Sequence, residues 1–160
     1  MKKQIFSFGW AFRGFWSSVC EEPHLRFHIV AGLYVLAFSF FYDFYAAQWA
    51  ALIVLIALVI ATELINTAVE RVCNAVTREK NPLIQIAKDA AAGAVLISAI
   101  AAVAVAVIFF WKPETLWKIL MTFTGAPVLF VPLGLSAAVS VIFIWLGPTG
   151  IKNMLTKKKR

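Results

Sequence analysis

Two carboxylates and an amide lie close together at the end of a long apolar stretch of this chain. The segment ATELINTAVERVCNAV, residues 61–76, follows an apolar run that begins at Ala46. On an α-helix, which turns by about 100° per residue, Glu63, Asn66 and Glu70 occupy positions i, i+3 and i+7 and share one face. Ionisable side chains are costly to place in membrane helices and mark functional sites by default. We call these three residues the acid stripe.

The acid stripe has the side chains that phosphoryl transfer needs. Carboxylates bind Mg²⁺, which usually keeps several waters and takes one or two protein acids plus substrate phosphates. A further carboxylate can accept the proton of an attacking hydroxyl, while Lys and Arg side chains neutralise phosphates. The chain supplies further groups of these kinds at Arg13, Glu22, Lys88 and Asp89. At a membrane surface this set suits phosphate transfer to a lipid alcohol.

Two limits apply to that interpretation. The sequence contains no GxxxxGK[ST] motif, so a nucleotide site here would differ from a P-loop. A structural role also stays open, in which Glu70 marks the membrane interface and Glu63 pairs with a basic residue.

The composition places these residues in a membrane protein. The chain has 160 residues, of which 62% are hydrophobic and 14% charged, whereas soluble domains are about half apolar and a quarter charged. A membrane-spanning helix needs about 20 mostly apolar residues. We therefore predict an all-α integral membrane helical bundle, with three core transmembrane helices and a fourth C-terminal one. The four apolar stretches are 27–41, 45–65, 83–111 and 119–146.

The segments around these spans have patterns of their own. Aromatic and aliphatic residues recur at helical spacing near the N-terminus, which predicts an amphipathic surface helix. Pro23 suits the first turn of the next helix, with Glu22 at its cap. Asp43 marks a tight hairpin between the first two spans, and Pro127 and Pro132 predict a kink or break near the start of the fourth.

The basic residues predict the orientation of the bundle. Cytoplasmic loops are enriched in Lys and Arg, and with four spans all 15 of these residues except Lys112 and Lys118 fall on one side. Both termini are then cytoplasmic. The net charge of +7 indicates contact with anionic lipid headgroups, and we expect no nucleic-acid partner.

The motifs in this chain resemble those of a known family. ELINTAVE is followed by AKDAAAGAVL, and AFRGFWSSVCEEPHLRFHI lies upstream, where Glu22, Arg26 and His28 have the family spacing. Over residues 5–111 the chain is similar to the small prokaryotic diacylglycerol kinase and undecaprenol kinase family. The resemblance implies an ATP-dependent lipid kinase, with undecaprenol favoured as acceptor and diacylglycerol as the other candidate.

The resemblance also implies roles for the acids. Glu63 matches the general base that takes the proton of the lipid hydroxyl. Glu22 and Glu70 match the carboxylates that bind Mg²⁺, with Glu21 as the competitor of Glu22. Asn66 resembles the amide that supports the metal and the phosphates.

The nucleotide site implied by the resemblance includes Lys88 at the ATP phosphates, Asp89 beside it and Arg13 on the surface helix. The family is trimeric, so the resemblance implies a homotrimer, in the bacterial cytoplasmic (inner) membrane. The chain departs from the family at Asn74, where Asp is usual. We expect residues 1–112 to form the kinase domain and 113–160 a C-terminal extension with one span and a basic tail.

Two other functions are alternatives to a lipid kinase. A small transporter or channel subunit could use the acids as a cation path, and a non-enzymatic scaffold would need no site at all. A cation path should carry polar residues through the membrane depth, and the first, third and fourth spans have few. A scaffold leaves the acid stripe unexplained.

Overall fold

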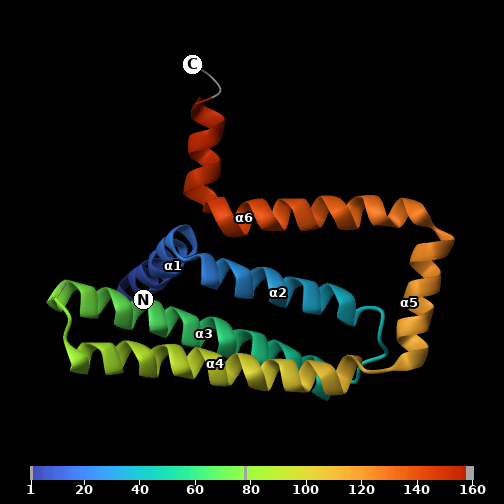
Figure 1. The fold of residues 1–160 in the computed structure, drawn as a ribbon, viewed down its shortest axis with the longest axis horizontal. Coiled ribbons are helices and arrows are strands. Elements are labelled where there is room, and N and C mark those ends of the chain that lie inside the picture. The colour runs from blue at the N-terminus through green and yellow to red at the C-terminus, as the bar shows by residue number, and fades with distance from the viewer. Residues whose placement is uncertain (1, 78, 158–160) are drawn as a thin grey trace.

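The protein is a bundle of α-helices, as the sequence predicts. The computed structural model describes residues 2–77 and 79–157, which contain no strand. Arg78 and the tail residues Lys158, Lys159 and Arg160, which entered the orientation argument, lie outside the described residues. The elements, shown in Figure 1, are α1 (Lys2–Glu21), α2 (Pro23–Ser39), α3 (Ala46–Val76), α4 (Pro82–Phe110), α5 (Pro113–Gly125), the short 3₁₀ helix η1 (Pro127–Leu129) and α6 (Phe130–Lys157).

Three of the described helical segments are long and apolar enough to cross a membrane. These are Ala46–Val76, Pro82–Phe110 and Pro127–Met154. The first expected span is shorter, since α2 has 17 residues and is therefore about 26 Å long at 1.5 Å per residue. A bilayer core is about 30 Å thick. Helix α2 nevertheless runs beside α3 and α6 (Figure 1), which keeps it within the bundle.

The long helices pack side by side in the order α6, α2, α3 and α4, which differs from their order in the chain. Helices α3 and α4 form a long hairpin, α2 lies against α3, and α6 lies against α2 on the other side. Gly32 allows the close approach of α2 to α3, because a Cβ atom there would lie 2.7 Å from Ile56. Helix α1 crosses the end of the bundle where α2 begins and α3 ends (Figure 1). Proline starts both α2 and α4, and the Asn81 side chain caps α4 by accepting from the backbone of Leu83.

The fourth span differs in extent from the expected stretch, 119–146. The helix breaks at Ala126, so that Pro113–Gly125 forms the separate helix α5 and the span begins at Pro127. The predicted break near the prolines is therefore confirmed, but its effect is larger than a kink, since α5 runs across the end of the bundle (Figure 1). A second break at Gly147, not foreseen from the sequence, turns the last part of α6 away from the bundle.

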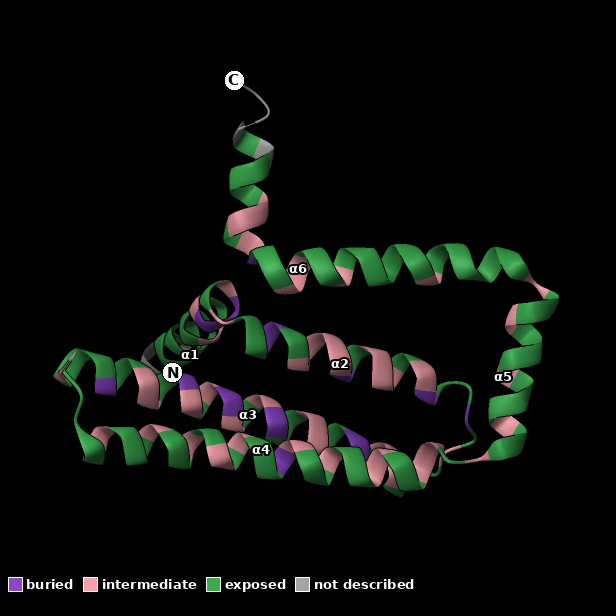
Figure 2. Cartoon of the chain, viewed as in Figure 1, coloured by how far each residue is buried: buried purple, intermediate pink, exposed green. Residues whose placement is uncertain are grey.

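Most apolar side chains of the bundle face outward. Figure 2 shows exposed residues over most of α4, α5 and α6, whereas buried ones gather where α1, α2 and α3 meet. Large hydrophobic residues such as Ile97, Val103 and Ile108 of α4 are exposed. Soluble monomers rarely expose apolar surface on this scale, so lipid or further chains must cover these faces.

A hydrogen bond between side chains holds α3 to α4 within the membrane. Thr62 Oγ1 and Ser98 Oγ are 2.9 Å apart, and either hydroxyl could be the donor. Each hydroxyl is also within hydrogen-bond distance of a carbonyl of its own helix, so one of the two donates there and accepts from the other. Ser98 is buried. This contact joins the two helices one residue from Glu63.

We expect Ser98→Ala to lower the free energy of unfolding by about 0.6 kcal/mol, the average for hydrogen bonds between membrane helices. Unfolding in mixed detergent micelles measures it, with Thr124→Ala on Pro113–Gly125, whose hydroxyl donates to carbonyls of its own helix, as the comparison. A variant as stable as the wild type would show that Thr62 finds an equally good partner in its own helix.

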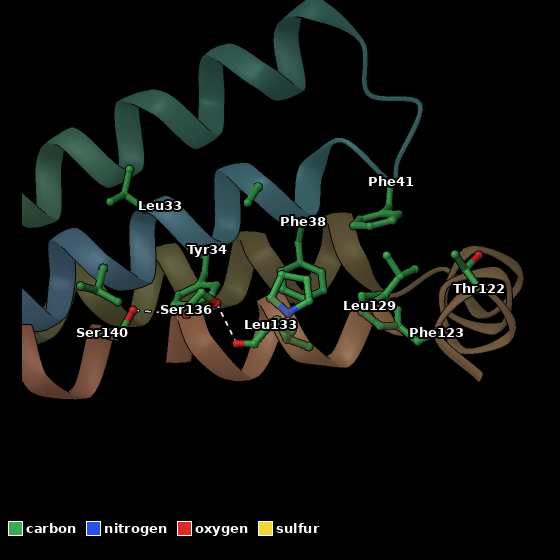
Figure 3. Close-up of a pocket in the computed structure, with 13 residues that line it drawn as sticks. Leu33, Tyr34, Phe38, Phe41, Thr122, Phe123, Leu129, Leu133, Ser136 and Ser140 are labelled. Carbon is green, nitrogen blue, oxygen red and sulfur yellow. Dashed lines mark hydrogen bonds between the residues drawn. The ribbon is translucent and has the colours of Figure 1, made fainter. Parts of the chain in front are cut away.

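The C-terminal extension is attached to α2 by specific contacts. Tyr34 Oη lies 3.0 Å from Ser136 Oγ and 3.2 Å from Ser140 Oγ of α6 (Figure 3). These residues line a cavity of about 490 Å³ between α2, α5 and α6. Its other polar lining residue, Thr122, donates to Lys118 O, so the hydroxyls around this cavity bond within the chain.

Candidate functional site

The length of α3 brings the acid stripe to the membrane boundary. With 31 residues, α3 is about 46 Å long and exceeds the bilayer core of about 30 Å. If the core begins near Ala46, it ends close to Glu63, and Glu70 lies beyond it. The side chain of Glu63 is buried, with 5% exposed, whereas Asn66 and Glu70 are half-buried.

Ionisable side chains from two helices lie near Glu63. Glu70 of α3, together with Glu22 and His24 at the start of α2, lies within electrostatic reach of its carboxylate. The alternative structural role, in which Glu63 pairs with a basic residue, has no ion pair behind it among the described residues, where His24 is the basic group within electrostatic reach of Glu63. His24 is not among the residues that the sequence predicts for the site, although its position two residues after Glu22 in the same helical turn is a usable signal.

Asn66 and Glu70 place two side-chain oxygens that could bind a metal ion close together on α3. Asn66 Nδ2 donates to Glu70 Oε1 at 3.3 Å, which fixes the orientation of the amide. Asn66 Oδ1 is buried and has no hydrogen-bond partner. A buried acceptor without a partner is costly, and a cation or a metal-bound water beside it would satisfy the oxygen.

These oxygens fit the requirements of Mg²⁺. The ion takes oxygen ligands, retains waters, and needs one or two protein carboxylates when phosphates complete its shell. Among the described residues no three His, Cys, Asp or Glu side chains are close enough to hold a metal ion. The donor set therefore suits a metal that arrives with nucleotide phosphates, rather than one held by the protein alone.

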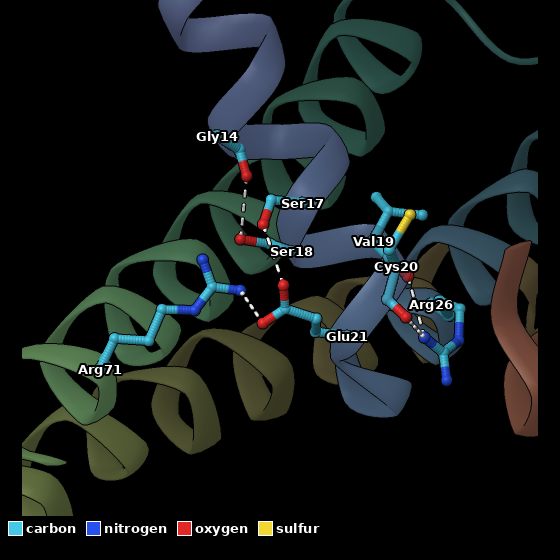
Figure 4. A network of polar contacts seen from close by, with 8 residues as sticks. All are labelled: Gly14, Ser17, Ser18, Val19, Cys20, Glu21, Arg26 and Arg71. Carbon is cyan, nitrogen blue, oxygen red and sulfur yellow. Dashed lines mark hydrogen bonds and ion pairs between the residues drawn. The ribbon is translucent and has the colours of Figure 1, made fainter. Parts of the chain in front are cut away.

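The structure separates the two glutamates before α2. Glu21 Oε2 accepts from Arg71 Nη2 at 3.0 Å, and Glu21 Oε1 accepts from Ser17 Oγ at 3.1 Å (Figure 4). Glu22 is instead the N-cap residue of α2, and its side chain caps nothing. The Glu22 carboxylate thus remains available next to Glu63.

The remaining candidates are spread over two helices. Lys88 Nζ of α4 donates to Asn74 Oδ1 of α3 at 2.7 Å, which places this lysine beside the end of α3. Asp89 is exposed and accepts from Gln85 Nε2. Arg13 lies on α1 with its guanidinium 4.6 Å from the ring centre of Trp10. Among the residues that the structure describes, no hydrogen bond or ion pair joins Arg13 or Asp89 to the acid stripe, whereas Lys88 is bonded to α3.

An apolar pocket begins one helical turn before Glu63 and extends toward the start of α3. It has a volume of about 290 Å³ and lies between α2, α3 and α4, with Val59 and His28 among its lining residues. Val59 is four residues before Glu63 and therefore on the same face of α3. The pocket extends along α3 as far as Leu52, so that hydrocarbon could lie there with a polar end at Glu63.

Comparisons with known proteins show the family. The sequence pattern described as prokaryotic diacylglycerol kinase matches residues 9–110. An undecaprenol kinase of Bacillus subtilis is 35% identical over 104 residues, which cover 65% of this chain and 85% of the relative. A diacylglycerol kinase of Synechocystis sp. is 37% identical over 102 residues, covering 63% of this chain and 58% of that protein.

Proposed function

The chain belongs to the prokaryotic diacylglycerol kinase family and is a lipid kinase, and we propose that it transfers the γ-phosphate of ATP to the hydroxyl of undecaprenol. Diacylglycerol is the second candidate acceptor. The observation that carries the proposal is the buried carboxylate of Glu63. An apolar pocket lies beside the part of α3 that precedes it, and the acids Glu22 and Glu70 lie within its electrostatic reach. Undecaprenol is preferred because the undecaprenol kinase is matched over 85% of its length and the diacylglycerol kinase over 58%.

In this proposal Glu63 is the general base. The hydrocarbon of the acceptor lies in the pocket that contains Val59, and its hydroxyl reaches the Glu63 carboxylate. Glu63 accepts the hydroxyl proton as the oxygen attacks the γ-phosphorus and the bond from that phosphorus to ADP breaks. A positioned base contributes about 10²–10⁴-fold to such a rate.

The other residues bind the nucleotide and its metal. Glu22, Glu70 and Asn66 Oδ1 would hold Mg²⁺, which when bound neutralises charge on the phosphates. Lys88 contacts the phosphates, with Asp89 beside it and Arg13 on α1 as a further basic contact.

The proposal includes an arrangement of the whole protein. Residues 1–112 form the kinase domain and 113–160 the extension. The protein is a multi-pass protein of the bacterial cytoplasmic membrane, with α2, α3, α4 and α6 crossing it and both ends of the chain on the cytoplasmic side. It acts as a homotrimer, for which the exposed apolar faces of α3 and α4 provide surface. Membership of a kinase family argues against a transporter, channel or scaffold.

A competition between acceptors tests the choice of lipid. Purified protein in mixed micelles receives labelled ATP and equal amounts of undecaprenol and diacylglycerol, and the two phosphorylated products are separated by thin-layer chromatography. We expect undecaprenyl phosphate to form faster. Preferential labelling of diacylglycerol would overturn the assignment of undecaprenol and leave the lipid kinase activity in place.

The neighbouring glutamates give a matched pair of variants. We expect Glu22→Gln to weaken MgATP binding by about 10-fold, the lower end of the range for changes around bound metals. Glu21→Gln removes a surface ion pair with Arg71, and such pairs contribute roughly 0–1 kcal/mol, so MgATP binding should be unchanged. Calorimetric titration of MgATP measures both. The opposite ranking would assign the metal ligand to Glu21.

A further inference from the structure

Arg26 is a buried cation whose partners are carbonyl groups. It lies on the first turn of α2, and 3% of it is exposed. Its Nη1 donates to Val19 O at 2.9 Å and to Cys20 O at 3.1 Å (Figure 4). Its Nε donates to Ile144 O of α6 at 2.9 Å. A buried charge is costly unless it is fully hydrogen-bonded. Three carbonyls from two distant parts of the chain accept hydrogen bonds from this guanidinium, which has five N–H donors.

Prolines explain why two of these carbonyls are available. In a continuous helix the carbonyl of residue i accepts from the N–H of residue i+4. The partner of Val19 would be residue 23 and that of Ile144 would be residue 148, and both are proline, which has no N–H. Arg26 therefore donates to carbonyls that Pro23 and Pro148 leave without a helical donor.

Gly147 allows α6 to reach this arginine. Its φ is 62°, in the region that favours glycine. A Cβ atom at this position would lie 2.7 Å from Arg26 Nη1 and 3.3 Å from Cys20 O. Any side chain at residue 147 would thus push α6 away from Arg26, and the sequence Gly147–Pro148 both bends α6 and frees the carbonyl that Arg26 binds.

The contacts of Arg26 surround the backbone of Glu22. Its side chain binds carbonyls two and three residues before Glu22, and its own backbone N–H donates to Glu22 O at 3.3 Å. The backbone N–H of Glu22 donates to Ser18 O at 2.8 Å. The corner between α1 and α2, where Glu22 sits, is therefore fixed from both sides and joined to α6.

We propose that Arg26 is a positioning residue through which α6 holds the α1–α2 corner, and with it Glu22, in place for binding MgATP. This inference rests on the proposed role of Glu22 as a metal ligand. It gives the extension a part in the kinase site, although residues 113–160 lie outside the region that matches the family, 9–110.

The variant Pro148→Ala tests the contact between Arg26 and α6 without changing any residue of the proposed kinase site. It gives residue 148 an N–H that can bond to Ile144 O and withdraw this carbonyl from Arg26. Pro132→Ala, in the first turns of the same helix, is the matched control. We expect Pro148→Ala to weaken MgATP binding about fivefold, which corresponds to one hydrogen bond of ordinary net strength, with kcat at saturating MgATP unchanged. Calorimetric titration without lipid measures the affinity.

A second variant and two outcomes complete the test. Arg26→Lys keeps the charge but loses the planar fork that reaches several acceptors, so its MgATP affinity should fall in the same direction. If Pro148→Ala binds MgATP as well as Pro132→Ala does, the inference is overturned. A wild-type protein that phosphorylates neither lipid overturns the proposed function instead, because the titration contains no acceptor.

Discussion

Replacing Glu63 by glutamine should lower the rate of phosphate transfer by at least about 10²-fold, the low end of what a positioned general base contributes. The amide has nearly the same size but cannot take a proton from the lipid hydroxyl. Glu63 is buried, and Glu22, Glu70 and His24 are ionisable groups within electrostatic reach of it. No nearby group in the described structure has the same position at the end of the apolar pocket.

Single-turnover kinetics and MgATP titration separate the possible roles of Glu63. We expect Glu63→Gln to bind MgATP and lipid as the wild type does and to transfer phosphate slowly. Glu114→Gln, on α5 and far from the acid stripe, is the control for loss of one negative charge. A Glu63→Gln protein that binds MgATP weakly but turns over normally at saturation would make Glu63 a ligand and not the base.

Replacing Glu70 by glutamine should have the largest effect on nucleotide binding. Glu70 and the unpartnered Asn66 Oδ1 form the pair of oxygens on α3 best placed for a metal ion. The glutamine keeps the size of the side chain and a hydrogen-bonding oxygen, but it loses the charge that attracts Mg²⁺. We expect MgATP affinity to fall about 10²-fold, the upper end of the range for changes around bound metals.

Titration of Mg²⁺ at fixed ATP measures this effect and provides its control. The activity of Glu70→Gln should be partly recovered at high Mg²⁺ concentration. The slow phosphate transfer of Glu63→Gln should not be recovered, because its defect lies in proton transfer. Thermal unfolding without nucleotide should be the same for both. Normal MgATP affinity in Glu70→Gln at ordinary Mg²⁺ concentration would remove Glu70 from the metal site.

Local patterns in the sequence predicted the helices and the acid stripe. The spacing of Glu63, Asn66 and Glu70 depends only on the period of a helix, so their common face follows as soon as α3 is recognised. The start of α2 at Pro23 and the break at Pro127 follow from the missing N–H and fixed φ of proline. These features require no knowledge of what packs against them.

Features that depend on distant partners could not be predicted in this way. Arg26 was counted as one of the basic residues that set the orientation, but it is buried against Ile144, 118 positions away. Glu21 and Glu22 differ by one position, and they are distinguished by the ion pair of Glu21 with Arg71 and by the place of Glu22 within electrostatic reach of Glu63. The bend at Gly147 lies against Arg26, a contact that periodicity does not encode.

The most direct test of the account is transfer of labelled phosphate from ATP to undecaprenol by the purified protein. The account predicts that label given as γ-phosphate appears in a polyprenyl phosphate, that chelation of Mg²⁺ prevents this, and that Glu63→Gln slows it by at least about 10²-fold. Label that stays in ATP and inorganic phosphate with undecaprenol and with diacylglycerol alike, from protein that is folded and binds MgATP, would contradict it.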